Sequence, residues 1–392
     1  MQDVFPSGST VLWRVLRRAA CSSVRRLAMT TAMTAGALAL SFSAASAFGA
    51  TAPDASFNDP LTTAASPSSL ATHSLMVGVA KAGPNLVAVG RRGLILMSSN
   101  AGKSWTQVAS PVAADLTAIR FSDANHGWIV GHDAVVLKST DGGLSWRRAL
   151  DGRAILNIIL KTYTARSAAG DAVATSVMND AKASAAQSAT PGVYPYPLLD
   201  VWFANNSEGF VVGAFGLILH TTDSGVTWTP WIERTENDHM NHIYAVNGVA
   251  GQVYIAGEQG FLRRLNSAGD GFVKMSSPYK GSYFGLYIQK DLLVAYGLRG
   301  NAYVSVDEGA QWNQVNTGLS DNIVAAFPGS GQDLLFVSQA GDMLSTDRVG
   351  GSAKAFKVKR ASEVYGAVPS GGAIVTMGLA GINIVSLPAT AP

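Results

Sequence analysis

The chain has 392 residues, a formal net charge of +3 and a hydrophobic content of 47%. Five of the 29 Lys and Arg residues and one of the 26 Asp and Glu residues lie in residues 1–47, which leaves 24 basic and 25 acidic residues beyond them. The basic excess therefore belongs to the N-terminal segment, and the rest of the chain lacks the positive charge expected of a nucleic-acid-binding protein. The single cysteine, Cys21, also lies in this segment, which excludes stabilisation of the remainder by disulfides.

Residues 1–47 have the pattern of a secretory signal peptide. Five arginines accompany an apolar stretch at residues 27–45, which is too short and too rich in small residues for a membrane span. The sequence Ala-Ser-Ala at residues 45–47 is a small-x-small cleavage site. We therefore expect an exported, periplasmic protein whose mature chain begins near Phe48. An arginine pair in the leader leaves twin-arginine export open beside ordinary secretion.

A turn motif of the Asp-box type, Ser/Thr-x-Asp-x-Gly-x-x-Trp, recurs four times along the chain. The Asp or Asn side chain is expected to accept hydrogen bonds from the turn backbone two residues on, Gly supplies a positive φ, and Trp packs back over the hairpin. The residues predicted to have this structural role are Asn100, Trp105, Asp141, Trp146, Asp223, Trp228, Asp307 and Trp312. A catalytic or metal-binding role for these acids is the less favoured alternative.

A second motif, a Gly-x-x-Gly-like turn between apolar runs, recurs seven times. It begins at residues 90, 131, 213, 257, 297, 338 and 378, so that every step but one is 40 to 44 residues. Short strands rich in Val, Leu and Ile at this period are typical of four-stranded propeller blades. We therefore predict an all-β fold over residues 73–392, a seven-bladed β-propeller of four-stranded antiparallel blades.

The one long step, of 82 residues, coincides with residues 151–197, which carry no blade motif. This segment is rich in Ala and contains an apolar run, so we predict a helical insertion between blades 2 and 3. The seventh blade lacks an outer strand because the chain ends soon after residues 382–387. We predict that a strand within the N-terminal segment, residues 48–72, closes the ring at this blade.

The two motifs are expected on opposite faces of the propeller. Asp-box turns join the third and fourth strands of a blade, whereas Gly-x-x-Gly turns join the second and third. The Gly-x-x-Gly face carries variable turns rich in Arg and Tyr, and we predict that a macromolecular partner binds there. The predicted partner-binding residues are Arg91, Arg92, Phe215, Glu258, Gln259, Tyr279, Lys280, Tyr283 and Arg299. The structural alternatives are solvated turn positions for Arg91 and Arg92, and packing between blades for Tyr279 and Tyr283.

The sequence predicts neither catalytic residues, nor a metal site, nor a cofactor. His239 and His242 have a spacing seen among metal ligands, but no third ligand is evident. Some Asp-box propellers are sialidases; those enzymes need an arginine cluster with a Tyr-Glu pair and an Asp, and their Phe-Arg-Ile-Pro stretch is absent here. A glycan-binding protein or a sialidase-like glycoside hydrolase remains the alternative function.

Four segments of the chain resemble bacterial members of the photosystem II stability/assembly factor family. They are LDVWFANNSEGFVVGAFGLILHTTDSGVTW (199–228), AGEQGFL (256–262), SPYKGSYFG (277–285) and YGLRGN (296–301). The similarity spans nearly all of residues 75–385 and is most specific in the middle third.

This resemblance implies a non-catalytic periplasmic or lumenal propeller that assists the assembly of a membrane-protein complex. It implies an arginine-rich binding face, to which Arg91, Arg92 and Arg299 would belong. The Ala-rich insertion departs from the photosynthetic pattern, so the expected partner is either a photosystem subunit or an envelope transporter. We expect a monomer that binds no nucleic acid.

Overall fold

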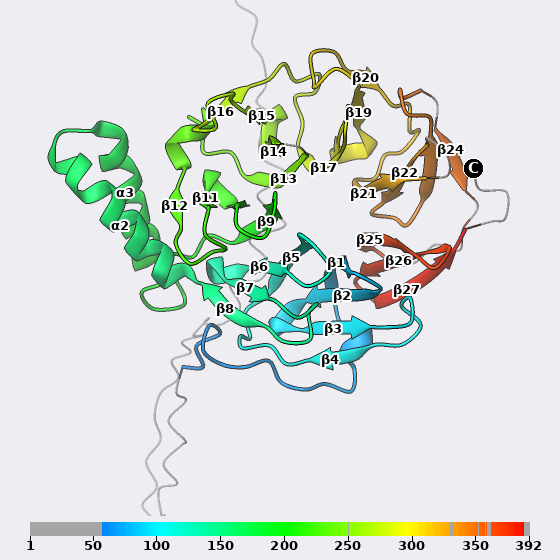
Figure 1. Cartoon of the computed structure of the whole chain (residues 1–392), viewed down its shortest axis with the longest axis horizontal. Helices are drawn as coiled ribbons and strands as arrows, with labels where there is room; N and C mark the ends of the chain where they lie inside the picture. The colour runs from blue at the N-terminus through cyan, green and yellow to red at the C-terminus, as the bar shows by residue number, and fades with distance from the viewer. Residues whose placement is uncertain are drawn as a thin grey trace, which may run out of the picture. The chain divides into compact units, whose positions relative to one another are not determined.

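Seven antiparallel sheets make up most of the chain (Figure 1). The computed structural model describes residues 57–387 except 250, 330–332, 352, 357 and 359–361. The predicted signal peptide and its cleavage site lie outside the described residues. Each sheet is called a blade here and is numbered in chain order.

Blade 1 consists of β1 (Met76–Ala82), β2 (Asn85–Gly90), β3 (Ile95–Ser98) and β4 (Thr106–Val108). Blade 2 consists of β5 (Leu116–Phe121), β6 (Gly127–Gly131), β7 (Val136–Ser139) and β8 (Arg147–Leu150). Blade 3 consists of β9 (Leu198–Phe203), β10 (Gly209–Gly213), β11 (Ile218–Thr221) and β12 (Thr229–Pro230). Blade 4 consists of β13 (Ile243–Val249), β14 (Gln252–Gly257), β15 (Leu262–Leu265) and β16 (Phe272–Lys274).

Blade 5 consists of β17 (Tyr283–Gln289), β18 (Leu292–Gly297), β19 (Ala302–Ser305) and β20 (Asn313–Gln314). Blade 6 consists of β21 (Ile323–Pro328), β22 (Leu334–Ser338), β23 (Met343–Thr346) and β24 (Lys354–Phe356). Blade 7 consists of β25 (Val364–Ser370), β26 (Ala373–Gly378) and β27 (Gly381–Ser386). In every blade the strands pair in sequence order.

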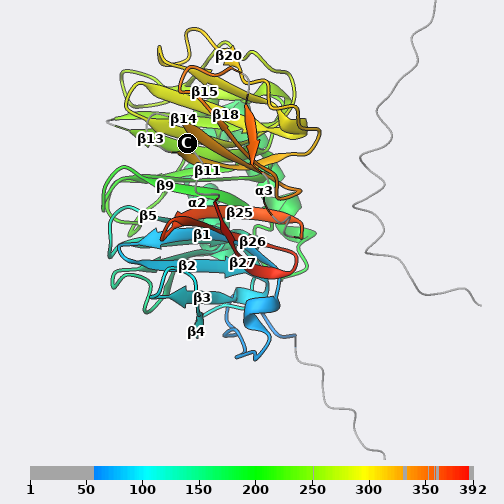
Figure 2. The same cartoon turned by 90° about the vertical axis from the view of Figure 1, so that its right-hand side faces the viewer.

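The blades surround a common axis as those of a β-propeller do (Figure 1). The first strands of successive blades contact one another in chain order, and β25 of blade 7 contacts β1 of blade 1. In the edge-on view of Figure 2 the strands run from one face of the ring to the other, so their turns gather on two opposite faces. Because the blades pack face to face, second strands such as β6 and β10 are buried along their whole length and read as continuous apolar runs.

In the part of the chain that the structure describes, blade 7 has three strands, and the predicted four strands are found in the other six blades. The described residues 57–72 contain part of the short helical turn η1 (Ala71–His73) and no strand. Residues 57–72 instead run along blades 1 and 2, where Leu61 is fully buried and the Ala65 N–H donates to the Ser110 carbonyl at 3.1 Å. Pro60 and Pro67 interrupt this segment, and proline has no N–H for a strand ladder.

Two helices, α2 (Gly152–Ala168) and α3 (Ala172–Ala186), occupy the segment between blades 2 and 3. Each begins at an aspartate whose carboxylate accepts N–H groups of the first turn, Asp151 for α2 and Asp171 for α3. Neither helix in the described part of the chain is long and apolar enough to cross a membrane.

An acid just after blade 3 binds two residues of α2. Glu233 accepts hydrogen bonds from the Tyr163 hydroxyl and, at 2.6 Å, from the Arg166 guanidinium. Tyr163 is also fully buried, together with Ile155 and Ile159 on the same face of α2. The helical pair is therefore a packed extension of the ring.

The Asp-box turns are stapled by two side chains each. In blade 3, Asp223 accepts the Thr227 N–H at 2.8 Å, and Thr221 accepts the Gly225 N–H at 3.0 Å while donating to Asp223 at 2.9 Å. We predicted that the carboxylate accepts a backbone N–H two residues on, but it accepts the N–H four residues on, because it bridges the whole turn. Asp141 and Asp307 make the corresponding contacts, and Asn100 does so in blade 1.

Replacing Thr221 with Val should destabilise the protein by about 1–3 kcal/mol, because the buried Gly225 N–H loses its acceptor. Urea unfolding followed by tryptophan fluorescence measures this change. Thr229→Val, on the exposed edge strand of the same blade, is the matched control and should stay within about 0.5 kcal/mol of the parent. Equal stability of the two variants would contradict a stapling role for Thr221.

The stability supplied by Asp223 should depend on pH. Hydrogen bonds from the Thr227 hydroxyl and N–H lower the pKa of Asp223 below its ordinary value of 3.8. A lowered folded-state pKa stabilises the fold above the unfolded-state pKa, and this contribution is lost as the pH falls through the folded-state pKa. Asp223→Asn should therefore be less stable than the parent at pH 6, and the difference should shrink towards pH 3. A constant difference across urea titrations at both pH values would contradict this linkage.

Candidate functional site

The Gly-x-x-Gly turns share an unusual backbone conformation. In five of them the second of the two central residues is not glycine yet has a φ of 52° to 55°: Arg92, Asp133, Phe215, Gln259 and Arg299. A residue with a Cβ adopts this left-handed conformation only at a cost of about 1–2 kcal/mol. Four of the five are exposed, Asp133 being the exception. The fold thus holds one side chain per turn in the same strained position while its chemistry changes from blade to blade.

Side chains from the next blade hold three of these turns. The N–H of Arg92 donates to Asp115 Oδ1 at 2.7 Å, and the N–H of Arg299 donates to Asn322 Oδ1 at 3.1 Å. In blade 3 the Phe215 N–H donates to Nδ1 of His242 at 3.0 Å. Each acceptor lies within two residues before the first strand of the following blade. The turns are therefore part of the contact between blades.

Predicted site residues of blades 3, 4 and 5 come together on one stretch of the rim. His242 joins blades 3 and 4: its Nδ1 accepts the Phe215 N–H, and its own N–H donates to Glu258 Oε2 of blade 4 at 2.9 Å. The Tyr279 hydroxyl donates to the Leu298 carbonyl at 3.3 Å, which joins the blade 4–5 connection to the turn of blade 5. The exposed side chains of this stretch are Phe215, Gln259, Lys280 and Arg299, with Glu258 half-buried among them.

Arg91 and Arg92 lie on the same face but apart from this stretch. They belong to blade 1, which neighbours blades 2 and 7 and not blade 5. Arg91 Nε pairs with Asp115 Oδ2 at 3.2 Å, and both arginines line a groove of about 1130 Å³ beneath the N-terminal segment. The arginines therefore do not form the single cluster that the sequence led us to expect, because two blades separate Arg92 from Arg299.

Tyr283 is a correction to the predicted site. Its side chain is fully buried among blades 4 and 5, its hydroxyl lies 3.0 Å from Ser277 Oγ, and burial raises its pKa to about 12. Tyr283 thus packs between blades and is not exposed to a partner. Tyr279 is half-buried and stacks on Tyr303 with a centroid distance of 5.9 Å.

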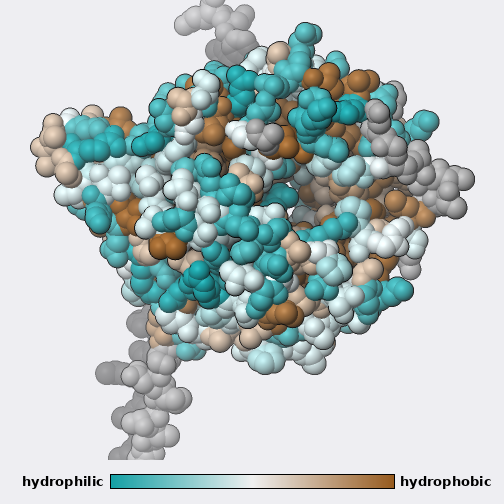
Figure 3. All heavy atoms as spheres, in the orientation of Figure 1, coloured by the Kyte–Doolittle hydropathy of each residue, from teal (hydrophilic) through white to brown (hydrophobic). Residues whose placement is uncertain are grey.

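The central channel carries a charged pair at its wall. Arg120 of β5 faces Asp200 of β9, with Nε 3.4 Å from Oδ1. Asp200 also accepts the Val246 N–H at 3.1 Å, so three blades meet at this carboxylate. Burial raises the pKa of the neighbouring Tyr296 to about 12. The opening amounts to about 210 Å³, and Figure 3 shows a hollow near the middle of the ring.

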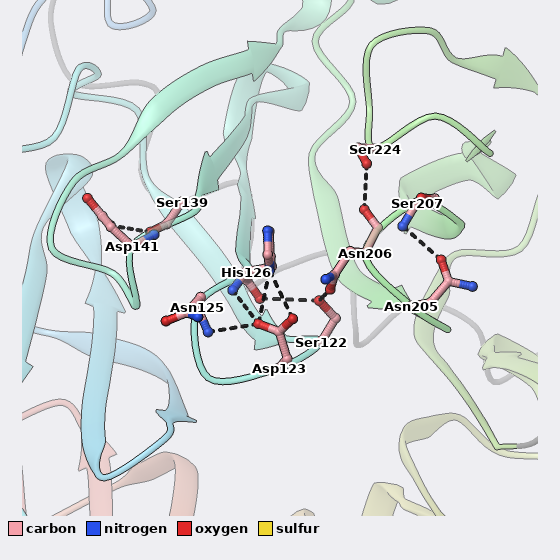
Figure 4. A network of polar contacts seen from close by, with 10 residues as sticks. All are labelled: Ser122, Asp123, Asn125, His126, Ser139, Asp141, Asn205, Asn206, Ser207 and Ser224. Atoms are coloured by element: carbon pink, nitrogen blue, oxygen red, sulfur yellow. Dashed lines mark hydrogen bonds and ion pairs between the residues drawn. The ribbon is translucent and has the colours of Figure 1, made fainter.

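The opposite face is a network of turn contacts. Around blades 2 and 3, Asp123 accepts the N–H groups of Asn125 and His126, both at 2.7 Å, and Ser122 Oγ donates to Asn206 Oδ1 at 3.0 Å (Figure 4). The N–H bond from His126 holds the pKa of Asp123 well below its usual range. These polar groups bind one another and so stabilise the turns.

Metal-ligating side chains do not gather in the part of the chain that the structure describes, where no three His, Cys, Asp or Glu residues are arranged to hold an ion. His242, considered above with His239, has its Nδ1 engaged by the Phe215 N–H. The sequence did not reveal His242, Asp115 or Asn322 as turn-holding residues. A polar residue recurring just before the first strand of a blade is the signal that could have found them.

Comparison with known proteins gives the same family as the motifs. The sequence profile described as "Photosynthesis system II assembly factor YCF48" matches residues 97–170 and 193–280. Over these residues the chain is similar to the photosystem II assembly factor family. The chain is 41% identical over 66 residues to the chloroplast photosystem II stability/assembly factor HCF136 of Cyanidioschyzon merolae, which is 15% of each chain. It is 42% identical over 48 residues to the photosystem II assembly lipoprotein Ycf48 of Prochlorococcus marinus, 12% of this chain and 14% of the relative. The matches thus span about a seventh of the length of these curated relatives.

Solved structures of YCF48 share the fold of this chain. YCF48 from Cyanidioschyzon merolae superposes with a TM-score of 0.57 at 17% identity, covering 81% of this chain and 97% of that one. A structure described as YCF48 bound to D1 peptide has a TM-score of 0.55 at 15% identity, covering 81% and 93%. The WD40 propeller domain of Doa1 is comparable, with a TM-score of 0.56 at 9% identity, covering 84% and 98%. At these identities the superpositions show the fold alone.

Asp115 should control the mobility of the blade 1 turn. Asp115→Ala removes the acceptor of both the Arg92 N–H and Arg91 Nε, so amide exchange in a peptide covering residues 88–96 should become faster. Asp115→Asn keeps a neutral acceptor and should exchange at an intermediate rate. Hydrogen–deuterium exchange mass spectrometry measures the order of the three proteins. Identical exchange in all three proteins would contradict the role of Asp115 in holding the blade 1 turn.

Proposed function

We propose that this protein is an exported, non-catalytic assembly factor that binds a membrane-protein partner through the Gly-x-x-Gly face. The proposal is supported by one geometric observation: neighbouring blades 3, 4 and 5 present five side chains of four chemical kinds on one face, three of them (Phe215, Gln259 and Arg299) on turns with a positive φ. Loops held on a rigid scaffold are a common place for binding residues. The side chains include a ring, an acid, an amide and two cations: Phe215, Glu258, Gln259, Lys280 and Arg299.

The family relationship supports the same reading. The relatives are named for the assembly of photosystem II and not for a reaction, and one solved relative is described with a D1 peptide bound. We therefore propose an extracytoplasmic segment of a membrane protein as the partner, either a photosystem subunit or a subunit of another envelope complex. Export to the periplasm, or to the lumen of a photosynthetic host, would bring the protein to that segment.

The test is capture of the partner from membranes of the source organism. Arg92→Glu combined with Arg299→Glu should reduce recovery of the partner by at least about tenfold, because reversing charges at a binding hot spot costs roughly 2 kcal/mol or more. Quantitative mass spectrometry of proteins bound to the tagged, exported chain measures recovery.

Lys103→Glu is the matched control, since Lys103 is an exposed cation on the opposite, Asp-box face. Its recovery should equal that of the parent, and melting temperatures of all three proteins verify folding. Unchanged recovery with the double variant, or an equal loss with Lys103→Glu, would contradict partner binding through the Gly-x-x-Gly face.

A further inference from the structure

A continuous row of aromatic rings crosses the Gly-x-x-Gly face from the helical pair to the central channel. Successive ring centroids lie 4.4 Å apart for Tyr196 and Phe215, 4.6 Å for Phe215 and His242, 6.0 Å for His242 and Tyr244, and 5.4 Å for Tyr244 and Phe284. These five residues, called the aromatic band below, come from three blades that lie side by side in Figure 1.

Phe215 is the unusual member of the aromatic band. Its side chain is 43% exposed, and its φ of 54° is one that a bulky residue rarely adopts. The corresponding positions of the four other turns with this conformation hold the polar residues Arg92, Asp133, Gln259 and Arg299. Phe215 therefore combines two unfavourable features, a strained backbone and an apolar ring exposed to water. Such strain persists mainly where function requires it.

A second exposed apolar side chain stands beside this ring. Met240 is 40% exposed and also has a positive φ, of 50°. A Cβ added to Gly216, next to Phe215, would lie 3.8 Å from the Met240 Cα. The turn of blade 3 and the loop before β13 thus place two large apolar groups side by side at the surface.

The charge around the aromatic band is negative. Glu258 is 31% exposed at one side, where it accepts the His242 N–H at 2.9 Å and the Tyr244 hydroxyl at 3.2 Å. Asp180 of α3 lies at the other end, accepting the Tyr196 hydroxyl at 3.2 Å. Within the described part of the chain neither carboxylate is paired with a Lys or Arg side chain.

His242 lies beside Glu258: its Nδ1 is 3.6 Å from Glu258 Oε2 and accepts the Phe215 N–H at 3.0 Å. Rings flanked by carboxylates that no Lys or Arg side chain pairs with attract cations, since a guanidinium or ammonium stacks on the ring face while pairing with the acid.

We infer that the aromatic band is a docking surface for a partner polypeptide segment that carries a Lys or Arg next to a large apolar residue. The apolar side chain covers Phe215 and Met240, and the cation lies over the rings within reach of Glu258. This inference rests on the proposed function, because it names the chemistry of a partner bound on the same face. It differs in requiring a basic segment at blades 3 and 4, away from Arg92.

The test is selection of a random heptapeptide phage library on the immobilised exported protein, followed by fluorescence anisotropy with the selected peptides. We expect enriched sequences with Lys or Arg beside Leu, Phe, Met or Trp. Phe215→Asn should weaken these peptides at least tenfold with an unchanged or higher melting temperature, because Asn tolerates a positive φ. Val226→Asn, which also replaces an exposed apolar side chain with Asn at a 77% exposed residue on the opposite turn of the same blade, should leave affinity unchanged.

Glu258→Gln tests the charge separately. It keeps an acceptor for the His242 N–H and the Tyr244 hydroxyl, and it should abolish the difference in affinity between a selected peptide and its Lys→Gln counterpart. No enrichment, enrichment without basic residues, or affinity that Phe215→Asn does not alter would each overturn the inference. Glycan-array binding that Phe215→Asn abolishes, without peptide binding, would also overturn it and assign the surface to glycans.

Failure here is separable from failure of the proposed function. If Arg92→Glu with Arg299→Glu loses the membrane partner while Phe215→Asn retains it, the aromatic band is not used and the assembly role stands. If neither variant affects recovery of the partner, both proposals fall.

Discussion

Face-to-face packing of neighbouring blades is the constraint on which the rest of this structure depends. A second strand such as β6 is buried on both sides. Each blade therefore needs a neighbour on both of its faces to bury its apolar side chains. Between blades 2 and 3, Trp128 stacks on Phe203 with a centroid distance of 4.0 Å and an interplanar angle of 4°. Contact between β25 and β1 gives the first and last blades the same two-sided burial. The ring thus buries the faces of its sheets and leaves the turns as the freely variable parts.

This packing explains why the two faces differ in character. On the Asp-box face, short polar side chains bind the backbone of their own turns, as Thr221 and Asp223 do, and little is left for a partner. On the other face, the turn backbone is held by the next blade through Asp115, His242 or Asn322. The residue at the strained position is then free to vary, and it presents its side chain on a backbone that barely needs to reorganise on binding.

Local sequence patterns predicted much of the fold. The period of about 41 residues and the Asp-box turns predicted a β-propeller with an inserted helical segment between blades 2 and 3, and α2 and α3 lie there. The composition of blade 7, which has three strands in the described part of the chain, was not predictable in this way. The N-terminal segment was assigned to this blade only because a strand was lacking there, whereas Leu61 and the prolines place residues 57–72 along blades 1 and 2.

The sequence by itself determined the repeat, the turn chemistry and the positions of the variable residues, because each depends on amino acids close together in the chain. Only the tertiary structure decided which of those residues are neighbours. Ring order separates Arg92 from Arg299 by two blades, buries Tyr283, and brings Tyr196, Phe215 and His242 into one row. The physical reason is that adjacency between blades arises from how sheets pack around an axis, and no local pattern of residues records that packing.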